Sequence, residues 1–141
     1  MNRRTLLQLG SVGAAGALLL PKAALALSGN SSLQSPMAGG LFYTKEHPGR
    51  WAKKVGGHSP MIERKKSMIE VTTQHPMKAY KHYIIKHMIL NENFEFVSEH
   101  YFNPEKDELP VSQYEIGALT HRLYAVSVCN RHDTWVTALD L

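Results

Sequence analysis

The stretch HYIIKHMIL at residues 82–90, followed by NEN at 91–93 and FEFVSEHYF at 94–102, decides the fold class. Both longer segments are rich in β-branched and aromatic residues, which favour strands. The short polar segment between them is typical of a hairpin turn. We therefore expect residues 82–102 to form an antiparallel β-hairpin.

Short apolar stretches separated by Pro, Gly and Asn continue on both sides of this hairpin. Residues 67–72 suit a short strand, residues 103–109 a polar loop, and residues 119–128 and 135–139 further strands. No long stretch shows the apolar periodicity of a helix. These patterns predict an all-β fold, an immunoglobulin-like antiparallel β-sandwich, with no internal repeat.

The first 26 residues are expected to be a targeting segment. Arg3 and Arg4 precede an uncharged run at residues 6–20, and the small-residue pattern ALA follows at 24–26. This is the pattern of a signal peptide, and the adjacent arginines predict the twin-arginine subtype and a periplasmic protein. A signal of the general secretory type or an uncleaved anchor is the alternative, although the run is short and Gly-interrupted for a membrane span.

The remaining chain is predicted to hold a flexible Ser/Gly-rich leader at residues 27–40 and one domain at residues 41–141. Loss of residues 1–26 removes three cations and no acid, so the net charge falls from +4 to +1. Neither an excess of positive charge nor a known motif then supports nucleic-acid binding. We expect no nucleic-acid partner and no membrane span in the mature protein.

Cys129, the only cysteine, opens the segment CNRHDTW at residues 129–135. It cannot form an internal disulfide, and in an oxidising compartment a lone thiol is a liability unless it is buried, paired between chains or bound to metal. His132 follows at a spacing that lets both side chains turn toward one ion. Trp135 would cover such a site. The alternative interpretation of this segment is a buried thiol beside a surface histidine, with no metal.

Three further histidines lie upstream in loops or at strand starts. His58 and His75 each stand close before a proline, and Pro76 biases His75 toward extended geometry. Each alone would be an ordinary polar histidine, but one thiolate with four imidazoles suits a transition metal that accepts nitrogen and sulfur. The predicted metal ligands are His58, His75, His82, Cys129 and His132. The other histidines, which are His47, His87, His100 and His121, are interpreted as surface or packing residues.

In these motifs the chain resembles the superoxide reductases, the desulfoferrodoxin and neelaredoxin family. The family's elements are a His-x-Pro loop, a His-Pro-Met…His-Tyr-Ile stretch and Cys-Asn-x-His-Gly-x-Trp. Here they occur in the same order at residues 58–60, 75–84 and 129–135.

The resemblance implies one iron ion per chain, with His58, His75, His82 and His132 equatorial and Cys129 as axial thiolate opposite an open position. It implies one-electron reduction of superoxide to hydrogen peroxide, with an external rubredoxin- or cytochrome-like electron donor. Homo-oligomers are common among relatives, so a homo-oligomer is a further expectation. A single cysteine excludes the four-cysteine rubredoxin-like centre of some members.

The chain departs from the family pattern in three places. Gly56 and Gly57 stand where the family commonly has Glu and Lys, so Lys54, or its neighbour Lys53, is the candidate for supplying positive charge. The gap from His75 to His82 is one residue longer than is typical, which puts one ligand in doubt. Asp133 stands in the usual place of Gly.

Other functions remain open at this stage. A non-catalytic iron-binding or electron-transfer module of the same fold would tolerate the two glycines. A cupredoxin-type copper carrier would also have His and Cys ligands, but it normally has an axial Met after the last histidine, and none follows His132. A nucleophilic Cys–His enzyme would leave three histidines unexplained.

Overall fold

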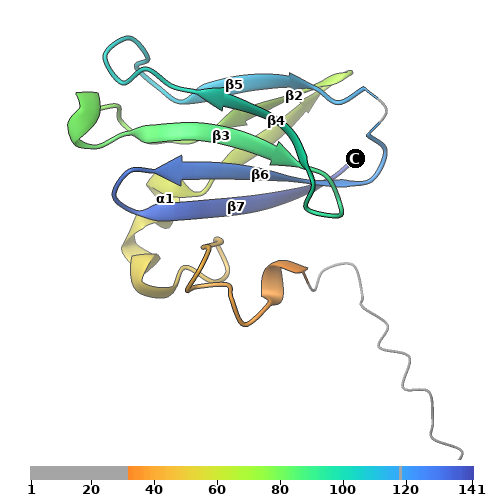
Figure 1. Ribbon diagram of the computed structural model, residues 1–141, viewed down its shortest axis with the longest axis horizontal. Helices are drawn as coiled ribbons and strands as arrows, with labels where there is room; N and C mark the ends of the chain where they lie inside the picture. Colours follow the sequence, from red (N-terminus) through yellow and green to blue (C-terminus); the bar gives the residue numbers. More distant parts are fainter. Residues whose placement is uncertain (1–31, 118) are drawn as a thin grey trace, which may run out of the picture.

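The computed structural model describes residues 32–117 and 119–141, so the predicted signal peptide at 1–26 and residues 27–31 lie outside the described residues. Seven β-strands form the body of the protein (Figure 1). They are β1 (Met61–Lys65), β2 (Met68–Thr72), β3 (Ile84–Leu90), β4 (Phe96–Tyr101), β5 (Val111–Glu115), β6 (Arg122–Cys129) and β7 (Asp133–Asp140).

The strands pair into two antiparallel sheets. One sheet has the order β1-β2-β5 and the other has the order β4-β3-β6-β7. Apolar side chains from both sheets meet between them, with Ile69 and Val71 from β2, Ile89 from β3, and Leu123 from β6 all almost fully buried. The predicted all-β sandwich is confirmed.

The predicted hairpin is present as β3 and β4. Its turn is held by the side chain of Asn91, whose Oδ1 accepts the backbone N–H groups of Asn93 and Glu95 at 2.9 and 3.0 Å. An Asn side chain that mimics a backbone turn in this way stabilises the connection at residues 91–95, which is two residues longer than the polar segment at 91–93.

Two strands, β1 and β5, were not predicted from the sequence. Four of the five β1 residues are exposed, so this edge strand lacks the apolar alternation that marks a half-buried strand. In β5 alternate residues are buried, but one of these buried positions is Ser112. The sequence of β5 therefore lacks the apolar alternation that predicts a strand.

Helical structure among the described residues is limited to segments of three to six residues. They are the α-turn α1 (Val55–His58) and the 3₁₀ turns η2 (Ser32–Gln34), η3 (Gly49–Lys54) and η4 (Ala79–Lys81). Within the described part of the predicted flexible leader, Leu33 packs against Tyr124, Val126 and Val136 on the larger sheet. No helix in residues 32–117 or 119–141 has the length and apolar character needed to cross a membrane.

A buried polar network joins the two sheets around His87, which is fully buried. Its Nε2 lies 2.8 Å from Thr73 Oγ1 and its Nδ1 lies 2.7 Å from Ser112 Oγ. Thr73 Oγ1 in turn donates to Ser127 Oγ at 3.0 Å. A neutral imidazole satisfies all these contacts, with Nε2–H donating to Thr73 and Nδ1 accepting from Ser112.

Burial lowers the pKa of His87 from 6.5 to about 3, so His87 stays neutral in the folded protein. Its contribution to stability is full above pH 6.5 and is lost as the pH falls toward 3. Over that range this residue alone should lower the free energy of unfolding by about 1.4 kcal/mol per pH unit. Denaturant unfolding of the metal-free protein at several pH values should therefore show a shallower dependence for His87→Gln. The exposed-residue control is His121→Gln, which should keep the wild-type slope because His121 does not act on His87. Equal slopes for wild type and His87→Gln would contradict the assignment.

Candidate metal centre

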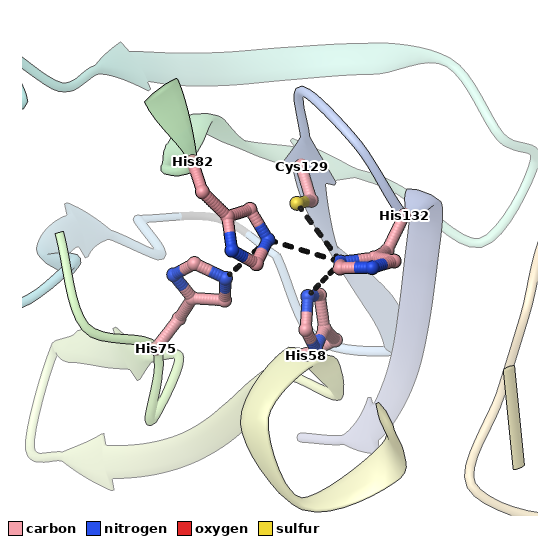
Figure 2. Close-up of side chains that lie close together, drawn as sticks. All are labelled: His58, His75, His82, Cys129 and His132. Atoms are coloured by element: carbon pink, nitrogen blue, oxygen red, sulfur yellow. Dashed lines mark hydrogen bonds between the residues drawn. The ribbon is translucent and has the colours of Figure 1, made fainter. Parts of the chain in front are cut away.

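Five potential ligands meet at one end of the sandwich, and each comes from a loop or from the end of a strand or helical turn (Figure 2). His58 ends α1 just before β1, His75 lies in the loop after β2, and His82 lies just before β3. Cys129 is the last residue of β6, and His132 lies in the turn that leads to β7. The structure thus brings together all five residues that the sequence predicts as ligands.

The ligand atoms are close enough to share one ion. All five lie within 4.8 Å of one another. His75 Nε2 is 3.0 Å from His82 Nε2, His82 Nε2 is 3.0 Å from His132 Nδ1, and His132 Nδ1 is 2.9 Å from His58 Nε2. Metal–imidazole bonds of about 2.1 Å place two nitrogens at right angles about 3.0 Å apart. The observed spacing therefore fits imidazoles around a common metal.

Hydrogen bonding alone cannot explain this spacing. His82 Nε2 and His132 Nδ1 each lie within hydrogen-bond distance of two other ring nitrogens. A neutral imidazole nitrogen carries either one proton or one lone pair, so the three contacts cannot all be hydrogen bonds. A cation that accepts the four lone pairs satisfies all four of the nitrogens that face the cluster at once.

The backbone fixes the tautomer of His58. Its Nδ1 lies 3.0 Å from the backbone carbonyl oxygen of Lys54, which is one turn earlier in the chain. Nδ1–H therefore donates a hydrogen bond to this oxygen. The lone pair is then on Nε2, which is the nitrogen that faces the cluster. Such a contact on the far nitrogen orients a ligand and raises its basicity.

The histidines are poised as neutral ligands because burial lowers the pKa of all four. The pKa of His58 and of His82 falls to about 4, and those of His75 and His132 are also lowered. Neighbouring positive charges act in the same direction. At neutral pH the rings therefore carry the lone pairs that metal binding requires.

Cys129 is 4% exposed, and its Sγ lies 3.8 Å from His132 Nδ1. Burial raises the pKa of the thiol, although the backbone N–H of Arg131, 3.4 Å from Sγ, favours the thiolate. The thiol is thus protonated at neutral pH unless a cation compensates the charge, because a bound metal deprotonates a coordinating thiol.

Two side chains hold the loops that carry these ligands. Asn130 Oδ1 accepts the backbone N–H of Tyr83 at 3.0 Å, which ties the Cys129 turn to the start of β3. Trp135 is fully buried and its Nε1–H donates to the carbonyl oxygen of His132 at 2.9 Å. The ring of Trp135 lies 5.9 Å from that of His58, so it lies beside the cluster.

The longer gap between His75 and His82 does not keep either ring away from the cluster. The segment between the two histidines contains η4, where Ala79 has a φ of 45°. Lys54, the predicted source of positive charge, is exposed on η3, and its charge contributes to the lowered pKa of three site histidines. The other four histidines lie outside the cluster: His87 is in the buried network, and His47, His100 and His121 are exposed.

The sequence did not identify Trp51 as a neighbour of the cluster. Its ring lies 4.7 Å from that of His132 in an edge-to-face contact. The only signal in the sequence is its partner Asp133, a charged residue at a position where the resembling family usually has Gly.

Comparisons with known proteins point to one family. The desulfoferrodoxin family model matches residues 49–138. No curated protein sequence matches the chain significantly. Similar solved structures include the one-iron superoxide reductase of Giardia intestinalis, at 22% identity and a TM-score of 0.54, covering 60% of this chain and 98% of that one.

Two further solved structures illustrate the similarity. One is a variant of the superoxide reductase (neelaredoxin) of Ignicoccus hospitalis, at 24% identity and a TM-score of 0.58, covering 72% of this chain and 93% of that one. The other is the superoxide reductase of Treponema pallidum, at 21% identity and a TM-score of 0.52, covering 61% and 69%. At these identities the structures support the fold. The family model spans more than half of the chain, so the chain belongs to the desulfoferrodoxin family, which implies one iron ion per chain with the five-residue cluster as its candidate site.

Proposed function

We propose that this protein is a periplasmic superoxide reductase. The observation that carries the proposal is the cluster of four imidazoles and one thiol in a member of the desulfoferrodoxin family. His58, His75, His82, His132 and Cys129 would hold the iron. When bound, a ferrous ion supplies the electron that superoxide takes up, and an electron-rich thiolate ligand favours that transfer.

The burial of the ligands supports a site with one accessible side. His58, His75 and Cys129 are buried, whereas His82 and His132 are half-buried, so the cluster reaches solvent beside these two rings. Superoxide would approach there, accept one electron from the reduced centre and two protons from solvent, and leave as hydrogen peroxide. An external electron-transfer protein of rubredoxin or cytochrome type would return the electron.

The test is the reaction of the reduced, iron-loaded protein with superoxide. We expect one hydrogen peroxide for each superoxide consumed, together with oxidation of the centre. Dismutation would give half that yield. Decay of superoxide at its spontaneous rate, with the iron still ferrous, would contradict the proposal.

Lys54 is expected to attract the anionic substrate. Its charge acts on His75, His82 and His132, and its side chain is exposed. Lys54→Gln should lower the second-order rate constant for superoxide several-fold, up to about 10-fold, and weaken its dependence on ionic strength. The substitution keeps the carbonyl group that accepts from His58, so iron content should not change. Lys53→Gln is the matched control, and an equal loss in both variants would contradict the assignment.

A non-catalytic iron-binding module is the second candidate, and Gly56 and Gly57 are the observation that favours it. These residues offer no charged side chain beside His58. A Cβ at Gly57 would lie 3.5 Å from the carbonyl oxygen of Gln74, which is an ordinary contact. Gly57→Lys should therefore raise the rate constant for superoxide by up to about 10-fold if the site is catalytic. A variant that binds iron but remains inert would favour the second candidate.

A further inference from the structure

Asp133 occupies a backbone conformation that favours glycine, with a φ of 61°. Residues with a Cβ rarely adopt this left-handed conformation, although Asp tolerates it better than most. The carboxylate is therefore retained at a position where glycine would be easier for the backbone.

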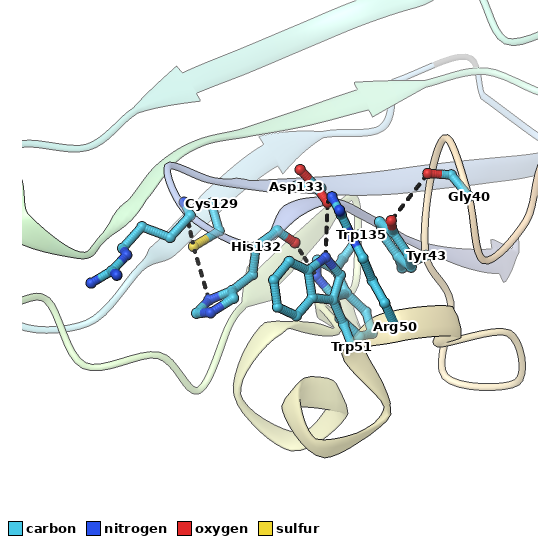
Figure 3. A network of polar contacts seen from close by, with 9 residues as sticks. Gly40, Tyr43, Arg50, Trp51, Cys129, His132, Asp133 and Trp135 are labelled. Atoms are coloured by element: carbon cyan, nitrogen blue, oxygen red, sulfur yellow. Dashed lines mark hydrogen bonds and ion pairs between the residues drawn. The ribbon is translucent and has the colours of Figure 1, made fainter.

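The carboxylate holds two side chains of η3 (Figure 3). Asp133 Oδ2 accepts Nε1–H of Trp51 at 2.8 Å and also pairs with the Arg50 guanidinium. That guanidinium lies over the Trp51 ring, 4.9 Å from its centroid. The other contact of the indole is with the ligand ring of His132, at 4.7 Å and an interplanar angle of 82°.

These contacts connect two ligand-bearing segments that are far apart in sequence. Trp51 and Asp133 are 82 residues apart. The 3₁₀ turn η3 runs directly into α1, which ends at His58, and Asp133 directly follows His132. The ring nitrogens of His58 and His132 that face the cluster lie 2.9 Å apart. The contact between Asp133 and Trp51 thus links the two segments that carry these candidate ligands.

We propose that Asp133 is a positioning residue that holds Trp51 against His132 and so slows the loss of the bound iron. The inference rests on the metal binding in the proposed function and not on superoxide chemistry. Partners that orient a ligand from behind typically change metal affinity by about 10- to 100-fold when they are removed.

An ordinary surface ion pair would have no such effect. The side chains of Arg50 and Asp133 are 64% and 39% exposed, and exposed pairs contribute little to stability. The contact that sets Asp133 apart from an ordinary surface ion pair is the hydrogen bond that it accepts from the N–H of the half-buried Trp51 indole. Variants that keep or remove an acceptor for this N–H therefore separate positioning from surface charge.

The experiment measures the rate at which the iron-loaded, full mature protein releases iron to an excess of a ferrous chelator. Asp133→Gly removes the carboxylate and suits the left-handed backbone, and it should release iron about 10-fold faster than wild type. Asp133→Asn keeps an oxygen acceptor for Trp51 and should stay close to the wild-type rate. Trp51→Phe keeps a ring but removes the donor, and it should release iron faster, like Asp133→Gly.

The matched control is Asp140→Asn, which weakens the Arg122–Asp140 pair at the other end of β7. It should leave the release rate unchanged. Wild-type rates for both Asp133→Gly and Trp51→Phe would overturn the positioning role alone, as would equally fast release by Asp133→Asn and Asp133→Gly. A wild-type protein that takes up no iron would overturn the proposed function as well. The thiolate-to-iron absorption of the oxidised protein gives a second readout, and it should shift in Asp133→Gly but not in Asp140→Asn.

Discussion

Replacement of Cys129 with serine is expected to abolish the thiolate-to-iron(III) absorption band of the oxidised protein. Cys129 is the only cysteine in the chain and its sulfur lies among the four imidazoles. A serine hydroxyl is harder and far less acidic than a thiol, so it cannot donate comparable electron density to iron. We also expect the reaction with superoxide to fall to the spontaneous rate.

The measurement is a visible spectrum of wild type and Cys129→Ser, reduced and then oxidised, at equal protein concentration. Unfolding of the two metal-free proteins is the control, because a buried Cys→Ser change should cost only about 1–3 kcal/mol in the absence of metal. A band that persists in Cys129→Ser would show that the sulfur is not a ligand.

Replacement of Trp135 with alanine is expected to have the largest effect on stability. The indole is fully buried, packs 5.6 Å from the ring of Tyr43, and donates to the carbonyl oxygen of His132. Loss of a buried aromatic residue of this size costs about 3–5 kcal/mol. Because the same side chain supports the His132 turn, the variant should also bind iron more weakly.

Denaturant unfolding and iron content measured on the same samples check both effects. Trp135→Phe is the graded variant: it keeps a ring in the core but loses the hydrogen bond to His132, so it should lose about 1–2 kcal/mol. A Trp135→Ala protein with wild-type stability would contradict the role of Trp135 in the core.

The central strands were predictable because their burial and composition agree. The segment that becomes β3 has β-branched residues at both buried and half-buried positions, and the Asn-rich turn after it carries its own side-chain hydrogen bonds. Strand β1 was not predictable, because a mostly exposed edge strand such as MIERK carries no apolar alternation. Its place depends on pairing with β2 rather than on its own composition.

The ligand set was predictable from residue types and motif order, but its assembly was not. Pairing of β3 with β6 places Ile84 opposite Cys129, which brings His82 beside the turn that carries Cys129 and His132. This register depends on the whole sheet. The contact between Trp51 and Asp133 could not be predicted either, because η3 and the start of β7 are far apart in sequence.

Metal analysis combined with X-ray absorption at the iron edge of the purified protein tests the central claim most directly. We predict about one iron per chain with one sulfur and four nitrogen ligands in the reduced state. An iron site without sulfur, copper in place of iron, or a correctly folded protein that binds no metal would contradict it.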